Sequence, residues 1–164
     1  MDELGVEKFN YNRFFEVKTN PFYSEILQNL YMSNNGEVYS YLQLCYQSFL
    51  LAPFGESLGA LFEKIANEDF LHIKILAQQI VAFGGNPVFA NTQGIWLGAR
   101  AINYSKNAKS MLIADIELKE KLIIDYKTAF LKIEDKNLKT LLKSIITEEE
   151  YHLSLFKKNL DNLH

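Results

Sequence analysis

Two stretches of this 164-residue chain place an acid and a histidine three residues apart in the middle of apolar helical stripes. In IANEDFLHIKIL the pair is Asp69 and His72, and in IITEEEYHLSLF it is Glu149 and His152. Residues three apart lie on one helix face, so each pair points the same way as the apolar residues around it. Because burying an unpaired carboxylate costs on the order of several kcal/mol, the fold must supply these charges with partners or with a cation.

Apolar residues recur at spacings of three and four along most of the chain, with only three prolines and eight glycines between them. This is the helical period, so the sequence predicts an all-α protein. Pro21 after Asn20 predicts a helix start, and Gly84 and Gly85 before Pro87 predict a firm helix end. The predicted helices cover about residues 21–51, 57–83, 105–132 and 137–160.

The connections between these helices differ in length, and this predicts the topology. Short turns join the first helix to the second and the third to the fourth, so each pair is expected to be antiparallel. Residues 85–104 separate the two pairs, and an extended segment of that size reaches up to about 66 Å, more than the roughly 40 Å length of a helix. The sequence therefore predicts a four-helix bundle with a long crossover between helices 2 and 3.

Composition places the chain in one domain and excludes several partners. We expect a single domain over 1–164, with the bundle at about 21–161 and the crossover, anchored by Trp96, at about 85–104. The net charge of −3, with both signs interspersed, gives no basic stripe for nucleic acid. There is no long apolar run for a membrane, and the single Cys45 excludes an internal disulfide framework. A soluble, cytoplasmic protein is the expectation.

The first and third helices add charged residues at the same level of the predicted core. The inward stripe of the first helix is predicted to contain Leu27, Leu30, Asn34, Glu37, Tyr41, Leu44, Ser48 and Leu51. That of the third helix is predicted to contain Leu112, Ile116, Lys119, Ile123, Tyr126, Phe130 and Ile133. The first, second and fourth helices thus bring carboxylates to the middle of the predicted core, and the third helix brings Lys119.

The sequence resembles the ferritin-like superfamily, in particular its rubrerythrin-like and manganese-catalase-like di-metal carboxylate proteins. The resemblance spans about residues 22–160. It is carried by GEVYSYLQLCYQS in the first helix, IANEDFLHIKILAQQIVAFGGNP in the second and IITEEEYHLSLF in the fourth. The last two combine the acid-histidine spacing with the surrounding apolar phase, and the second also has the Gly-Gly-x-Pro stop. In such bundles two helices each contribute a Glu and two each contribute Glu-x-x-His.

Carried over onto this chain, the resemblance implies five metal ligands. They are Glu37, Asp69, His72, Glu149 and His152. Asp69 stands where the family has Glu, and Glu68, four residues before His72, is a nearby substitute. Glu148 and Glu150 flank the last motif, and we expect them to be solvated or to support the ligands rather than to bind metal.

The third helix departs from the family pattern, which has a Glu seven residues before a Tyr. Counting back from Tyr126 gives Lys119, and Glu120 is one residue off, about 100° around the helix. Glu120 would reach the core only through a local bulge. Three carboxylates and one ammonium leave two negative charges, which one divalent ion balances. We therefore hypothesise an altered site that holds one metal ion or none, with Lys119 in place of the second ion.

The resemblance implies a non-haem iron or manganese protein that reduces or dismutates peroxide, which as an enzyme would be an oxidoreductase of peroxidase or catalase type. Hydrogen peroxide or dioxygen would be the small-molecule substrate, and because the chain has no CxxC pair, electrons would come from a separate donor. We expect a homodimer. Two alternatives stay open: an iron oxidation and storage protein of ferritin type, and a non-enzymatic structural or interaction bundle with a decayed metal site.

Overall fold

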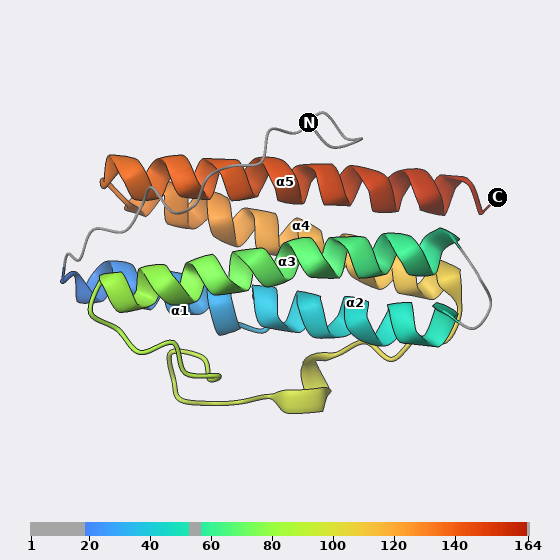
Figure 1. The fold of residues 1–164 in the computed structure, drawn as a ribbon, viewed down its shortest axis with the longest axis horizontal. Coiled ribbons are helices and arrows are strands. Elements are labelled where there is room, and N and C mark those ends of the chain that lie inside the picture. Colours follow the sequence, from blue (N-terminus) through green and yellow to red (C-terminus); the bar gives the residue numbers. More distant parts are fainter. Residues whose placement is uncertain (1–18, 53–56, 164) are drawn as a thin grey trace.

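The computed structural model describes residues 19–52 and 57–163, and all regular elements in these ranges are helical. They are α1 (Pro21–Met32), α2 (Glu37–Leu51), α3 (Ser57–Ala82), the short 3-10 helix η3 (Gly98–Ala101), α4 (Ala108–Lys132) and α5 (Lys136–Asp161). Figure 1 shows α1 and α2 following one another along one edge of a bundle whose other helices are α3, α4 and α5. The all-α four-helix bundle predicted from the sequence is confirmed.

The order of the helices in space follows from the connections. α2 and α3 are antiparallel, α4 and α5 are antiparallel, and α3 and α4 run in the same direction (Figure 1). Side-chain caps fix the helix starts: the Oδ1 atoms of Asn20, Asn107 and Asp135 accept backbone N–H groups of α1, α4 and α5. At the end of α3, Gly84 adopts a positive φ of 86°, the left-handed stop that the sequence predicts.

The first predicted helix is wrong in one respect, because the chain breaks it into α1 and α2 at residues 33–36. Asn34, which the helical spacing places on the inward stripe, is exposed within this break. Gly36 then caps α2, with Glu37 as its first helical residue. Glu37 is fully buried. The interruption therefore sets the position from which the first carboxylate enters the core.

The crossover, residues 83–107, packs along α1 and α2 on the outside of the bundle (Figure 1). The Trp96 ring stacks on the buried Tyr39 ring with centroids 5.8 Å apart, and the Tyr39 hydroxyl accepts the backbone N–H of Leu97. The side-chain amide of Gln28 donates to the backbone oxygens of Val88 and Ala90. Through these contacts the crossover packs on α1 and α2, with Trp96 as one of its anchors.

Buried apolar residues form two clusters with a polar layer between them. One cluster contains Leu76 of α3 and Leu142 of α5, and the other contains Phe62 of α3 and Phe156 of α5. The buried charged residues of α3 and α5 lie between these positions in the sequence of each helix. None of the described helices is both long enough and apolar enough to cross a lipid bilayer.

We predict that Gly36→Ala lowers the free energy of unfolding by about 1–3 kcal/mol, because the new methyl group overpacks the break. A Cβ at this position would lie 2.9 Å from backbone atoms of residues 31–33, which cannot move without shifting the end of α1. Asn34→Ala, in the same break but exposed, is the matched control. Urea unfolding of both variants measures the difference, and equal stabilities would contradict the close approach at residue 36.

Candidate metal centre

Ligand-type side chains from three helices meet in the polar layer. Glu37 of α2, Asp69 and His72 of α3 and Glu149 of α5 each offer one nitrogen or oxygen atom within 4.8 Å of the others, and all four are buried. Nδ1 of His72 lies 3.3 Å from Oε1 of Glu37 and 3.1 Å from Oε1 of Glu149. The acid-histidine spacing on α3 thus places both side chains on the face that the sequence predicts.

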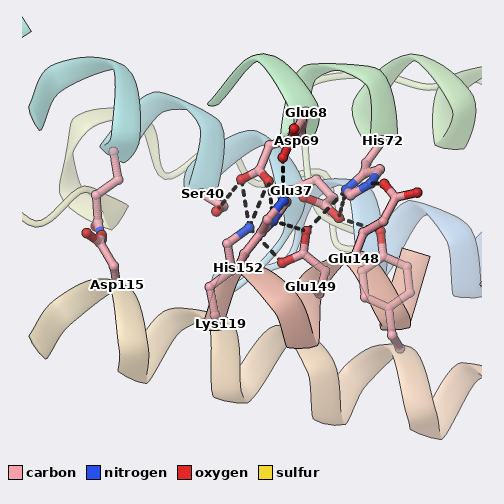
Figure 2. Close-up of polar contacts among 12 residues, drawn as sticks. Glu37, Ser40, Glu68, Asp69, His72, Asp115, Lys119, Glu148, Glu149 and His152 are labelled. Carbon is pink, nitrogen blue, oxygen red and sulfur yellow. Dashed lines mark hydrogen bonds and ion pairs between the residues drawn. The ribbon is translucent and has the colours of Figure 1, made fainter. Parts of the chain in front are cut away.

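His152 lies beside this group on the side of Asp69. Its Nδ1 atom is 3.6 Å from Oδ1 of Asp69 and 3.4 Å from Oε1 of Glu149. The rings of His72 and His152 face one another with centroids 6.3 Å apart (Figure 2). All five residues that the resemblance implies as ligands are therefore brought together, with His152 outside the most compact group of four.

The ammonium group of Lys119 lies in the same layer. Its Nζ atom is 2.8 Å from both side-chain oxygens of Asp69 and 2.6 Å from Oε2 of Glu149, and the side chain is 1% exposed (Figure 2). Burial alone would lower the pKa of Lys119, but the carboxylates of Asp69 and Glu149 raise it above its usual value. Lys119 is thus a permanent positive charge between two carboxylates that could otherwise bind metal.

The Lys119 ammonium and the histidines also set the protonation of the carboxylates. Burial raises the pKa of Asp69 to about 6 although Lys119 opposes the shift. For Glu149 burial acts in the same direction, but Lys119 and His152 hold its pKa well below the usual value. Burial would lower the pKa of both histidines, yet Glu37 raises that of His72 well above normal and Glu149 raises that of His152 to about 9. Without a metal, both imidazoles are therefore protonated at neutral pH.

Several buried ligand atoms have no hydrogen-bond partner among the described residues. They are Oε2 of Glu37, Nδ1 of His72, Oε1 of Glu149 and Nδ1 of His152, whereas Oε2 of Glu149 has the Lys119 ammonium at 2.6 Å. Carboxylate oxygens and imidazole nitrogens that converge in a buried layer suit a divalent cation, which would replace the imidazolium proton between Nδ1 of His72 and the oxygens of Glu37 and Glu149. The residues present therefore fit a manganese or iron ion near Glu37, His72 and Glu149.

Glu120, the uncertain substitute from α4, does not enter the core. It is about half exposed, and its Oε1 atom pairs with Nζ of Lys157 at 2.7 Å. α4 is α-helical throughout its length, so the bulge that would turn Glu120 inward is absent from this described helix. Glu150 is also exposed and pairs with Lys127, as expected for a solvated residue.

Sequence reasoning missed a second buried polar cluster on the inward face of α4. Asp115 is 2% exposed, and its Oδ1 atom accepts from Nε2 of Gln43 at 2.7 Å and of Gln47 at 3.0 Å. Oε1 of Gln43 accepts the backbone N–H of Asn103, which ties the cluster to the crossover. The signal was present, because Asp115 precedes Lys119 by one helical turn, but the predicted stripe took the neighbouring Ile116 instead.

Burial raises the pKa of Asp115 to about 7, while the amides of Gln43 and Gln47 oppose the shift. A carboxyl group whose pKa is raised on folding stabilises the fold fully below its unfolded pKa of about 4, and this contribution is lost as the pH rises through about 7. In the wild type this group therefore lowers the free energy of unfolding by on the order of a few kcal/mol between pH 5 and pH 8. We predict that Asp115→Asn abolishes this decrease, because the amide keeps an acceptor and cannot ionise.

Urea unfolding at pH 5 and pH 8, of protein stripped of metal, measures this difference. Glu117→Gln, an exposed acid on the same helix, is the control and should follow the wild-type pH dependence. An Asp115→Asn variant with the wild-type pH dependence would contradict the assignment of a buried, protonated carboxyl group.

Comparisons with known proteins agree with this arrangement. Residues 27–164 match the family model of the ferritin-like domain. The chain is 22% identical to a probable manganese catalase of Clostridium acetobutylicum, over 89% of this chain and 73% of that protein. It is also similar to two crystal structures of KatB, a manganese catalase from Anabaena, with TM-scores of 0.82 and 0.83. Both share 22% identity and cover 96% of this chain and 80% of theirs, a likeness that shows the fold. The chain belongs to the ferritin-like family.

Proposed function

We propose that this protein binds one manganese or iron ion, rather than two, and that its substrate is hydrogen peroxide. The observation that carries the single ion is the position of Lys119, whose ammonium contacts both Asp69 and Glu149. A two-ion site in a bundle of this kind uses a carboxylate from each of four helices, and here one of the four is replaced by a cation. With neutral histidines, the charges of Glu37, Asp69, Glu149 and Lys119 sum to −2, which suits one divalent ion.

The residues that would hold this ion are Glu37, His72 and Glu149, with Asp69 as the fourth member of the group. Asp69 is the least available of these, because Lys119 and the hydroxyl of Ser40 already donate to its oxygens. The hydroxyl of Tyr126 donates to Oε1 of Glu37 at 2.6 Å, which fixes that carboxylate and leaves its Oε2 atom without a donor. Oxygen-rich coordination with one imidazole favours manganese or iron over softer metals.

Hydrogen peroxide as substrate is inferred from the manganese catalases to which the chain is similar. A bound manganese or iron ion would supply the redox chemistry of peroxide decomposition. The chain's own contribution is to exclude water, because each charged residue of the centre is at most 1% exposed. Since each half-reaction of dismutation transfers a pair of electrons, we expect a single-ion site to turn over peroxide slowly unless a separate donor supplies electrons.

A metal-free structural or interaction bundle is the second candidate, and one observation favours it. At neutral pH Glu37, Asp69 and Glu149 face one ammonium and two imidazolium groups, so each of these fully buried carboxylates has a cationic neighbour without a metal. The outcome that favours this candidate is wild-type protein that takes up neither manganese nor iron.

We predict that wild-type protein binds one ion per chain and that Lys119→Glu binds two, because the substitution restores the fourth carboxylate and removes the competing cation. The measurement is metal content by elemental mass spectrometry after expression with manganese or iron and anaerobic purification. Lys121→Glu makes the same charge change at an exposed position of α4 and should leave one ion per chain.

Peroxide turnover of the same samples, measured by oxygen evolution, should be higher in Lys119→Glu than in wild type. Lys119→Gln removes the ammonium without adding a carboxylate, and it replaces Lys119→Glu in these measurements if the latter protein does not fold. Two ions per chain in the wild type, or one in Lys119→Glu, would contradict the proposal that Lys119 takes the place of the second ion.

A further inference from the structure

α3 and α5 each carry a second acid, four residues before the histidine, and each of these acids reaches the histidine of the other helix. Oε2 of Glu148 on α5 lies 2.8 Å from Nε2 of His72 on α3. Oε2 of Glu68 on α3 lies 2.7 Å from Nε2 of His152 on α5. The two contacts form a nearly symmetric pair of links between the helices, at the edge of the polar layer (Figure 2).

Each of these contacts decides which ring nitrogen faces the centre. A carboxylate that accepts the Nε2–H of a histidine fixes the ring orientation and leaves Nδ1 to bind a metal. For His72 the result is that Nδ1 lies 3.3 Å from Glu37 and 3.1 Å from Glu149. Glu148 is 23% exposed, so it reaches this nitrogen from the rim of the bundle rather than from within the centre.

Lys119 makes the surroundings of the two histidines unequal. Nδ1 of His152 faces Asp69 and Glu149, the carboxylates that already contact the Lys119 ammonium. Nδ1 of His72 belongs to the compact group that a single ion could occupy. The Glu148 contact therefore orients a histidine toward the candidate metal position, whereas the Glu68 contact orients a histidine toward the ion pairs of Lys119.

We propose that Glu148 is a positioning residue for the metal ion, through His72, whereas Glu68 only orients His152 beside Lys119. This inference rests on the proposed single-ion site. It extends that site by assigning different roles to two glutamates whose local sequences and contacts are nearly the same.

The first test is the dissociation constant for Mn²⁺ of metal-free protein, measured by calorimetry. Glu148→Ala is expected to weaken binding about 10–100-fold, the usual effect of removing a carboxylate behind a ligating histidine. Glu68→Ala is expected to leave the constant unchanged. Glu150→Ala is the control, because Glu150 is exposed on the same helix as Glu148 and pairs with Lys127 instead of a histidine.

The same substitutions in a Lys119→Glu background sharpen the test. With a fourth carboxylate restored, His152 should ligate a second ion, so Glu68→Ala should now weaken binding of that ion about 10–100-fold. Equal weakening by Glu68→Ala and Glu148→Ala in the wild-type background would overturn the unequal roles, because it would mean that His152 contacts the first ion. No weakening by Glu148→Ala would overturn the positioning role itself.

A second readout does not need the metal. In NMR spectra of the metal-free protein, the imidazole Nε2–H of His72 should exchange slowly in wild type and become invisible through fast exchange in Glu148→Ala. The His152 signal should respond to Glu68→Ala alone. Glu148→Gln should keep the His72 signal, because the amide oxygen can still accept the hydrogen bond.

These measurements distinguish failure of the single-ion proposal from failure of the proposed positioning role of Glu148. If wild-type protein binds neither Mn²⁺ nor Fe²⁺, the single-ion function is overturned, and the NMR measurement alone decides whether Glu148 orients His72. If one ion binds and the His72 signal is unchanged in Glu148→Ala, the single-ion function stands and the positioning role is overturned.

Discussion

The contact on which the rest of the structure depends is the one between the Lys119 ammonium and the carboxylates of Asp69 and Glu149. It joins α4 to α3 and α5 in the middle of the bundle, where water cannot screen the charges. Removing one partner of a buried ion pair costs much more than an exposed pair contributes, because the remaining charge is left unpaired. The polar layer between the two apolar clusters is therefore a set of mutually dependent charges.

The bundle supports this layer with features that lie outside it. The break between α1 and α2 determines where Glu37 enters, and the Tyr126 hydroxyl then holds that carboxylate. The crossover packs on α1 and α2 through Trp96 and Gln28, so the helix that carries Glu37 is covered on its outer side. The position of Glu37 in the polar layer thus depends on contacts that lie outside that layer.

Much of the fold was predictable, because helix starts and ends depend on neighbours a few residues away. The starts of α1, α3 and α5, the end of α4 and the left-handed glycine after α3 match the sequence predictions to within one residue. The start of α4 at Ala108 lies three residues later than predicted, where Asn107 provides the cap. The break at residues 33–36 was not predicted, although its sequence Ser-Asn-Asn-Gly is typical of a turn, because the helical spacing from Leu30 to Glu37 was followed straight through it.

The sequence by itself determined which residues share a helix face, and so which acids and histidines could meet in the core. It also determined that α4 brings a lysine rather than a glutamate to that level. Tertiary structure alone decided that Lys119 contacts Asp69 and Glu149 at once, and that Glu68 and Glu148 each pair with a histidine on the opposite helix. The physical reason is that spacing along one helix fixes the face to which a side chain belongs, whereas charge pairing and burial depend on distances between helices.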